Sequence, residues 1–258
     1  MDILGQIARD AGKSAARRKK DAEYRRLVDG LLENSEKTRR LAPVPKGNSI
    51  IAEVKFASPS GGVIAKGGVP AVVSDYEAGG AAALSILTEE HYFKGSLENL
   101  IQARNASELP ILRKDFILDE FQLEEARAFG ADGVLLIAGL LGEKLAGMLD
   151  AASSLGLWVL VETRSKAEIK LALDSGAKII GINNRDLKTM KTDLKTTIEL
   201  CTHVPASKAL VTESGLSNAA DIQKLKTECK RKPDYYLIGT ALMKDADRKK
   251  KLKELVNA

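Results

Sequence analysis

The chain contains 258 residues, of which 44% are hydrophobic and 29% are charged, and this balance excludes both a disordered protein and a membrane-spanning one. Its net charge of +5 is modest for the length, so an anionic small molecule explains it as well as a nucleic acid would. No stretch approaches the roughly 18 apolar residues of a membrane span, and the basic run at residues 17–20 is followed by further charges, unlike a signal peptide. We therefore expect a cytoplasmic globular protein.

Residues 1–48 are the first predicted element, an N-terminal helical extension. The pattern of residues 3–32 is helical and heavily charged, and the prolines of Leu41-Ala-Pro-Val-Pro end it before the first strand. Its apolar residues recur at spacings that place them on one helical stripe: Ile3, Leu4, Ile7, Leu27, Leu31 and Leu32. A stripe of this kind must cover another part of the protein.

Short runs rich in Val, Ile and Leu follow from residue 50 and alternate with amphipathic segments, which is typical of parallel strands connected by helices. They are residues 50–56, 82–87, 111–114, 133–138, 158–162, 179–183, 209–212 and 235–239. Such a series of strand–helix units predicts an α/β fold, a closed (β/α)8 TIM barrel with the N-terminal helical extension. We interpret residues 1–258 as a single barrel domain.

Several of the predicted helices end at glycine. The segments Glu77-Ala-Gly-Gly-Ala, Ala128-Phe-Gly-Ala-Asp and Asp174-Ser-Gly-Ala-Lys place glycine where a helix must turn left-handed before the next strand. These glycines are expected to stop helices and not to form ligand loops.

The first strand carries two charges that a barrel strand does not ordinarily bury. In Ile51-Ala-Glu-Val-Lys, side chains alternate between the two faces, so Glu53 and Lys55 lie on the same side, toward the barrel lumen. A buried charge is costly unless it is paired or used. The pair is therefore either a structural ion pair or part of a functional site.

Small, polar or ionisable residues recur at the C-terminal ends of most other strands, where the active sites of such barrels lie. They are Lys114, Asp115, Glu162, Asn183, Arg185, Glu213, Ser214, Gly239 and Thr240. Each one alone is compatible with a helix cap or a loop charge, but together they surround one rim with lysines, carboxylates and an arginine. The set predicts an active site at this rim.

Small residues with backbone N–H groups follow the last two strands, in Thr212-Glu-Ser-Gly-Leu and Ile238-Gly-Thr-Ala-Leu-Met. This is the usual phosphate site of a (β/α)8 barrel, where glycine lets the anion approach the chain closely. We expect a phosphate between these two turns, and we expect any Cβ at position 239 to intrude on it. The pattern alone indicates a phosphorylated substrate.

The motifs of these units resemble those of the indole-3-glycerol phosphate synthases. The resemblance runs from about Ile50 to Met243 and follows the family's order, in motifs such as Ile51-Ala-Glu-Val-Lys-Phe-Ala-Ser-Pro-Ser-Gly-Gly, Leu112-Arg-Lys-Asp-Phe, Val161-Glu-Thr, Gly181-Ile-Asn-Asn-Arg-Asp-Leu, Glu213-Ser-Gly and Leu237-Ile-Gly-Thr. Phe56 stands where the family more often has a basic residue. Thr240 stands where serine is usual, although threonine keeps the hydroxyl.

Carried over position by position, the resemblance implies three groups of site residues. The catalytic ones are Glu53, Lys55, Lys114, Glu162, Asn183 and Ser214. Substrate contacts fall on Ser58, Phe116, Arg185, Glu213 and Leu237, and phosphate contacts fall on Ser214, Gly215, Gly239 and Thr240. The implied substrate is 1-(2-carboxyphenylamino)-1-deoxyribulose 5-phosphate, whose two anionic ends suit a basic rim.

The implied reaction is ring closure, decarboxylation and dehydration to an indole, with no cofactor. Lys114 is expected to donate a proton to the ketone oxygen, and Lys55 and Glu162 are expected to serve the dehydration as acid and base. Glu53 positions Lys55, and Asn183 orients substrate hydroxyls. The resemblance also implies that the extension caps the active-site rim and lends it basic residues. The alternative is a stabilising cap at the opposite end of the barrel.

Two other functions are compatible with the sequence. One is an isomerase of phosphoribosyl substrates, because phosphate sites after the last strands are widely shared, although Glu53, Lys55 and Lys114 argue against it. The other is a nucleic-acid-binding protein on an inactive barrel, although the basic first forty residues contain a single aromatic for stacking, Tyr24.

Cys201 and Cys229 have no second sulfur or histidine at metal-ligand spacing, so we expect neither a disulfide nor a metal site. The expected partner is a small phosphorylated substrate, and neither nucleic acid nor a membrane is expected. We expect a monomer or a weak homodimer.

Overall fold

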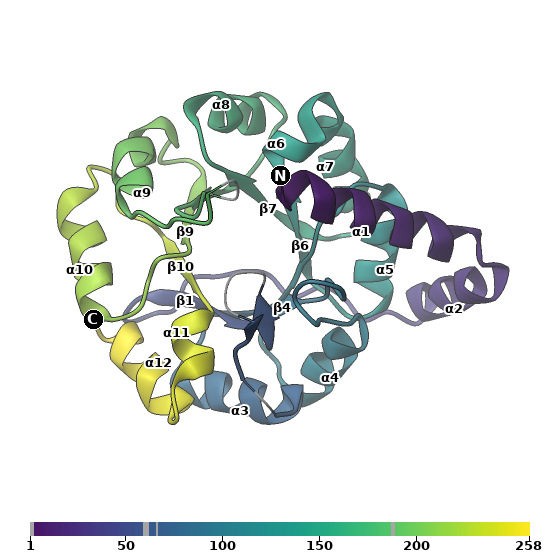
Figure 1. Cartoon of the computed structure of the whole chain (residues 1–258), viewed down its shortest axis with the longest axis horizontal. Helices are drawn as coiled ribbons and strands as arrows, with labels where there is room; N and C mark the ends of the chain where they lie inside the picture. Colours follow the sequence, from purple (N-terminus) through teal and green to yellow (C-terminus); the bar gives the residue numbers. More distant parts are fainter. Residues whose placement is uncertain (1–2, 59–61, 66, 187–188) are drawn as a thin grey trace.

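Parallel strands close into a barrel in the order β1-β10-β9-β8-β7-β6-β5-β4, with helices around it (Figure 1). The computed structural model describes residues 3–58, 62–65, 67–186 and 189–258, so parts of two motifs quoted above, at residues 59–61 and 187, lie outside it. The barrel strands are β1 Ser49–Val54, β4 Ala83–Leu87, β5 Ile111–Lys114, β6 Gly133–Ile137, β7 Trp158–Thr163, β8 Ile179–Asn183, β9 Ala209–Glu213 and β10 Tyr235–Ile238. The predicted (β/α)8 barrel is confirmed.

Helices follow the strands and cover the outside of the barrel. They are α3 Val69–Gly79, α4 Glu98–Ala106, α5 Glu120–Ala128, α6 Ala138–Leu141, α7 Leu145–Ser154, α8 Lys166–Asp174, α9 Lys195–Leu200, α10 Ala219–Glu228, α11 Thr240–Lys244 and α12 Arg248–Val256, with 3-10 turns at Gly142–Lys144 and Cys201–His203. The predicted helix stops are confirmed, since Gly80, Gly130 and Gly176 have φ of 90°, 95° and 90°. Within the described ranges, no helix has the length and apolarity needed to cross a membrane.

The strand faces alternate as the sequence pattern predicts. Ile50, Ala52 and Val54 belong to the core between the sheet and the outer helices. Ile51 belongs to the second core, which fills the lumen together with residues such as Leu112. Glu53 lies on the same face as Ile51 and therefore enters the lumen, as predicted.

The first strand ends earlier than the predicted Phe56. After Val54 the chain folds into a small antiparallel hairpin, β2 Ala57–Ser58 and β3 Gly62–Val63, which the sequence pattern did not reveal. The carbonyl oxygen of Phe56 accepts a hydrogen bond from the N–H of Ile64 at 2.7 Å. In a strand that continued to Phe56, this carbonyl would have paired with a neighbouring barrel strand. Here it bonds instead within the β1–α3 connection.

The extension forms two helices, α1 Ile3–Lys20 and α2 Ala22–Glu33, where the apolar pattern indicated one continuous stretch. Asp21 separates them because its backbone is extended (φ −79°, ψ 111°) and its carboxylate accepts the N–H groups of Glu23 and Tyr24 at 3.0 and 3.1 Å. Asp21 is thus the N-cap of the second helix.

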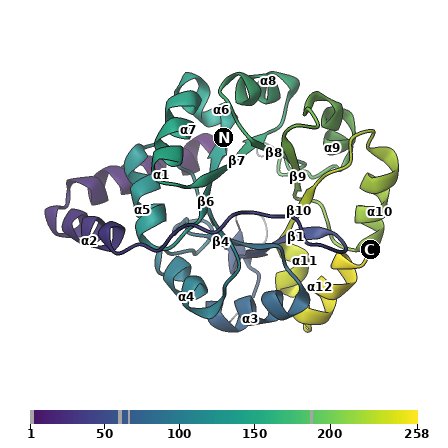
Figure 2. The same ribbon diagram turned by 180° about the vertical axis from the view of Figure 1, so that it is seen from behind.

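The extension covers both ends of the barrel. Helix α1 lies at the C-terminal rim, where Tyr92 in the β4–α4 loop donates a hydrogen bond to Asp10 at 2.9 Å. It crosses in front of the barrel in Figure 1, whereas the connection from α2 to β1 crosses the opposite end in Figure 2. There Arg39 N–H bonds Asp132 just before β6 at 2.8 Å, and Thr38 bonds the Gly156 carbonyl just before β7 at 2.8 Å. Different segments of the extension thus lie at the two ends of the barrel.

Candidate active site

A pocket of about 770 Å³ lies at the C-terminal ends of the barrel strands. It is lined by residues from β1, β4, β5, β6, β7, β8, β9 and β10 and from loops that follow the strands. Every site residue predicted from the sequence lines it: Glu53, Lys55, Ser58, Lys114, Phe116, Glu162, Asn183, Arg185, Glu213, Ser214, Gly215, Leu237, Gly239 and Thr240. The fold thus brings together side chains that lie up to 187 positions apart in the sequence, from Glu53 to Thr240.

Glu53 and Lys55 form an ion pair on the lumen face, with Lys55 Nζ 2.5 Å from Glu53 Oε1. Both side chains are largely covered, so the pair is shielded from solvent. A Cβ on Gly239 would collide with Glu53 Oε1, because β1 and β10 pair where the barrel closes. Glu53 thus also requires glycine at position 239. The close approach of a phosphate to Gly239 stays a prediction.

Lys114 extends from the end of β5 between two carboxylates. Its Nζ lies 3.4 Å from Glu162 Oε2 and 3.4 Å from Glu213 Oε2. Burial disfavours the charged ammonium, but the nearby carboxylates of Glu213 and Glu162 outweigh burial and raise the pKa of Lys114 above its usual value. Lys114 is therefore a charged donor at neutral pH. These three residues, with Glu53 and Lys55, are called the lumen set below.

Glu213 is the most deeply buried carboxylate of the lumen set, with 1% of its side chain exposed. Burial raises its pKa to about 8 despite the opposing ammonium of Lys114. Among the residues that the structure describes, none offers a hydrogen bond to Glu213 Oε1. That oxygen fits only because residue 181 on β8 is glycine, since a Cβ there would collide with it.

The turn after β9 has an unusual backbone. Ser214 and Gly215 both have left-handed φ, of 66° and 83°, which is uncommon for serine. The buried side chain of Asn184 fixes this turn, because its amide donates hydrogen bonds to the carbonyls of Glu213 and Ser214, each at 3.0 Å. Asn184 was not among the predicted site residues. The sequence signal that could have identified Asn184 is its position directly after Asn183, at the end of a buried strand.

Asn183 and Arg185 support the rim after β8. The backbone N–H of Arg185 donates to Asn183 Oδ1 at 2.9 Å, and Arg185 pairs with Thr192 in an antiparallel bridge. Asn183 is buried, whereas Arg185 is partly exposed at the pocket. These two residues thus support the rim through backbone contacts.

One wall of the pocket is apolar. Phe116 and Phe93 approach each other with ring centroids 6.3 Å apart, and Leu135, Ile137 and Leu237 line the same pocket. Phe93 was not predicted as a site residue. A wall of this kind suits a planar aromatic ring.

The basic residues of the extension do not enter the pocket. Among the described residues that line it, none belongs to the extension. Arg18 and Lys19 instead bind carboxylates of the α5 region, Glu125 and Asp119. The prediction that basic residues of the extension contact the ligand therefore has no support in this arrangement. Lys244 and Lys251, which the sequence reasoning missed, do line the pocket.

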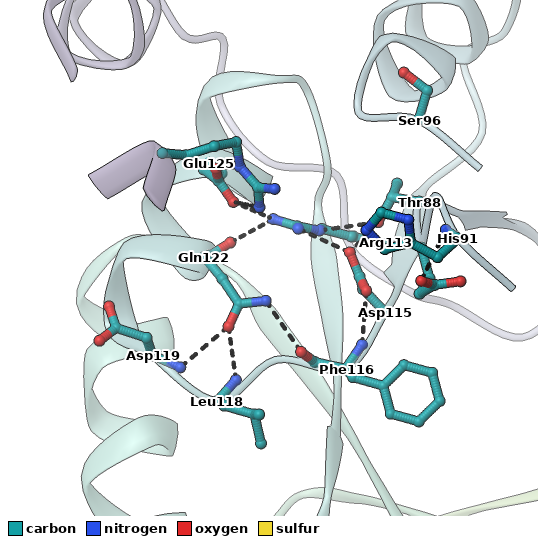
Figure 3. Close-up of polar contacts among 12 residues, drawn as sticks. Thr88, His91, Ser96, Arg113, Asp115, Phe116, Leu118, Asp119, Gln122 and Glu125 are labelled. Atoms are coloured by element: carbon teal, nitrogen blue, oxygen red, sulfur yellow. Dashed lines mark hydrogen bonds and ion pairs between the residues drawn. The ribbon is translucent and has the colours of Figure 1, made fainter. Parts of the chain in front are cut away.

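A second cluster of buried charge lies outside the barrel, beneath α5 (Figure 3). Its centre is Arg113, which is fully buried and donates to Asp115 at 2.9 Å, to the Gln122 carbonyl at 2.7 Å and to Thr88 at 3.1 Å. Glu125, also fully buried, lies 3.4 Å from Arg113. Its carboxylate is held more closely from α1 by Arg18, which donates to both oxygens, at 2.5 and 3.0 Å. Arg113, its partners and Arg18 are called the outer cluster below.

Within the described part of the chain, no three His, Cys, Asp or Glu residues are grouped so that they could hold a metal ion. Cys201 and Cys229 are both buried and both free thiols.

The family model for indole-3-glycerol phosphate synthase matches residues 6–255. The chain belongs to the indole-3-glycerol phosphate synthase family. The family's synthase from Aquifex aeolicus (strain VF5) is 46% identical over 239 residues, which cover 91% of this chain and 92% of that one. The synthase from Dehalococcoides mccartyi (strain CBDB1) is 41% identical over 261 residues, covering 98% of this chain and 100% of that protein.

Solved structures of other barrels show the fold alone. A thiamine phosphate pyrophosphorylase from Pyrococcus furiosus has a TM-score of 0.59 at 19% identity, over 81% of this chain and 93% of that one. A 3-hexulose-6-phosphate synthase from Salmonella typhimurium has a TM-score of 0.62 at 12% identity, and the match covers 81% of this chain and 96% of that one.

Membership of the synthase family decides between the functions that the sequence left open. The family's activity is that of a decarboxylating lyase of tryptophan biosynthesis, and this is the activity of the chain. The phosphoribosyl isomerase is thereby excluded as the main activity. The family match does not by itself assign a role to any individual residue.

Proposed function

We propose that the lumen set closes, decarboxylates and dehydrates 1-(2-carboxyphenylamino)-1-deoxyribulose 5-phosphate, with Lys114 as the acid of the ring closure. The observation that carries this assignment is the position of Lys114 Nζ in the pocket, 3.4 Å from both Glu162 and Glu213. A carboxylate at this distance favours the ammonium form, which is the form that can donate a proton and stabilise a developing negative charge.

Ring closure forms a bond between the ring carbon that bears the carboxylate and the ketone carbon of the sugar. The ketone oxygen gains negative charge in this step and takes a proton from Lys114. Carbon dioxide then leaves, and the electron pair of the broken bond restores the aromatic ring. The Phe116 and Leu237 wall supports the proposal, because it gives the ring an apolar surface beside the charged groups.

Dehydration needs one acid and one base. We assign the acid to Lys55, which Glu53 holds at 2.5 Å, and the base to Glu162. Glu162 is 3% exposed and has Lys114 as its ion-pair partner, so its carboxylate faces the reacting centre instead of solvent. The deep position of these groups in the lumen keeps bulk water away from the charged steps.

The phosphate of the substrate is assigned to the two turns after β9 and β10. The left-handed Ser214-Gly215 turn belongs to the class of turns that present successive backbone N–H groups to an anion. Gly239 and Thr240 line the pocket beside it. Asn183 is assigned to the substrate hydroxyls, with Arg185 supporting the rim. Ser58 is assigned to the substrate from the hairpin side.

The test is the appearance of indole fluorescence when the purified protein is mixed with the anilino-sugar phosphate. A mixture without substrate controls for the protein's own indole, Trp158. A phosphoribosyl isomerase substrate serves as the second control and is expected to stay unchanged. Conversion of that control with no indole from the anilino-sugar would overturn the proposal.

We also propose that the enzyme works as a monomer or weak homodimer on this one small substrate, without nucleic acid. Sedimentation at several protein concentrations measures the oligomeric state. A salt-dependent gel shift with single- or double-stranded nucleic acid measures nucleic-acid binding, and the expected result is no shift.

A further inference from the structure

The lumen set contains one more carboxylate than cations. Lys55 is paired with Glu53, which leaves Glu162 and Glu213 to share the single ammonium of Lys114. Both contacts are 3.4 Å long, beyond the roughly 2.7–3.2 Å of an ordinary N–H···O bond. A buried carboxylate without full compensation is costly, so this arrangement favours one proton bound to the surplus carboxyl group.

Glu213 is the carboxyl group best placed to hold that proton. It is more deeply buried than Glu162, and its Oε1 has no hydrogen-bond donor among the described residues. The ionisable groups that face it are Lys114 on β5, Glu162 on β7 and Glu53 on β1, so one cation stands against two further carboxylates. Burial, the largest cause, raises its pKa to about 8.

The reaction of the proposed function consumes one proton per turnover. The substrate carboxylate leaves as neutral carbon dioxide, while the ketone oxygen becomes a hydroxyl, so ring closure takes up one proton. Dehydration is neutral, because the proton given to the departing hydroxyl is matched by the proton lost from carbon. The acid of the ring closure must therefore be recharged in every cycle.

We propose that Glu213 stores a proton and passes it to Lys114 after Lys114 has protonated the ketone oxygen. This inference rests on the proposed function. The Lys114 ammonium gives its proton to the oxygen, and the lone pair of Nζ then takes the proton of the Glu213 carboxyl group. Glu213 becomes a carboxylate beside the restored ammonium. After the product leaves, water in the open pocket returns a proton to Glu213. Glu213 thus acts through Lys114 and not on the reacting carbons.

The first test is the dependence of kcat on pH in the intact enzyme and in Glu213→Gln. A glutamine keeps the size of the side chain but stores no acidic proton. The intact enzyme should lose turnover as pH rises through about 8, since Glu213 is then deprotonated. Glu213→Gln should have a kcat at least about tenfold lower at pH 7, the lower part of the usual range for proton-transfer help, and should lack that loss near pH 8. Glu213→Asp should restore part of the kcat at pH 7 and part of the loss of turnover near pH 8.

The matched control is Glu228→Gln at the exposed end of α10, which should keep both kcat and its pH profile. A Glu213→Gln enzyme with normal kcat, an unchanged pH profile and only a raised KM would overturn the inference, because Glu213 would then be a substrate contact alone.

The second test does not depend on activity. Infrared spectra of the ligand-free enzyme should show a protonated carboxyl band at pH 7 that disappears as the pH rises through about 8. The band should shift in Glu213→Asp, which assigns it even if the glutamine variant does not fold. Turnover without such a band would overturn the proton store and leave the proposed function standing. An intact enzyme that forms no indole would instead refute the proposed function.

Discussion

Arg113 and Lys114 are neighbours on β5, yet they enter two different clusters of buried charge. Arg113 points outward, where its contacts with Thr88, the Gln122 carbonyl and Asp115 have ordinary hydrogen-bond lengths. Glu125 lies 3.4 Å from Arg113 and is held more closely by Arg18. Lys114 points into the lumen, where both of its carboxylate contacts are 3.4 Å long. The strand alternation that separates the two faces thus separates two kinds of charged site.

The comparison shows that burial of charge alone does not identify a functional group. In the outer cluster, Arg113, Gln122 and Glu125 are away from the pocket. Arg113 donates to the Gln122 carbonyl at 2.7 Å, and both oxygens of Glu125 accept hydrogen bonds from Arg18. In the lumen, both carboxylate contacts of Lys114 are 3.4 Å long, and Glu213 has an oxygen without a donor among the described residues. Complete hydrogen bonding indicates a structural cluster, whereas incomplete bonding next to a pocket indicates groups available to a substrate.

The largest expected effect is that of Lys114→Ala on turnover. The loss of a general acid should lower kcat by at least about a hundredfold, while the fold and the phosphate affinity stay largely intact. The measurement is steady-state turnover together with circular dichroism. Lys170→Ala, which removes an exposed lysine on α8, is the matched control and should change neither. Near-normal turnover of Lys114→Ala would remove Lys114 from the mechanism.

Arg113→Met should break the outer cluster and act mainly on stability. It leaves the buried carboxylates of Asp115 and Glu125 with fewer partners, and breaking a buried pair in this way costs about 3–5 kcal/mol of unfolding free energy. Denaturant unfolding measures the loss. Turnover per folded molecule should fall far less than in Lys114→Ala. A stable Arg113→Met protein without turnover would place Arg113 in the active site. It would refute the distinction between a structural outer cluster and a functional lumen set.

Arg18→Ala should have the smaller effect on the same cluster. Glu125 then keeps Arg113 and the hydroxyl of Tyr24, which lies at 3.1 Å, so the expected loss of stability is about 1–3 kcal/mol. The neighbouring Arg17, which is exposed, provides the control Arg17→Ala with no measurable change. Equal losses in the two variants would show that Arg18 does not stabilise the cluster.

The barrel and most of the rim could be predicted from the sequence because their signals are local. Lys114 directly follows a run of buried strand residues, and Glu53 and Lys55 alternate with apolar residues on a single strand. Parallel strands place all such C-terminal ends on one side of the barrel, so separate local signals converge on one site.

The remaining features depend on contacts that no local pattern encodes. Arg18 and Glu125 are 107 positions apart and meet only after α1 has packed against α5. Gly239 meets Glu53 because β1 and β10 become neighbours on closure of the barrel, with Ala52 paired to Ile238. These contacts are consequences of the tertiary fold.

The measurement that tests the account most directly is made on Glu162→Gln, with turnover and thermal unfolding followed on the same sample. Glu162 lies near the C-terminal end of the strand β7, in the lumen, and the change removes its negative charge while keeping its shape. The account predicts a kcat lower by at least about a hundredfold, with the free energy of unfolding changed by less than about 1 kcal/mol. A variant that unfolds much earlier but turns over normally while folded would make Glu162 a structural partner of Lys114 and would contradict the account.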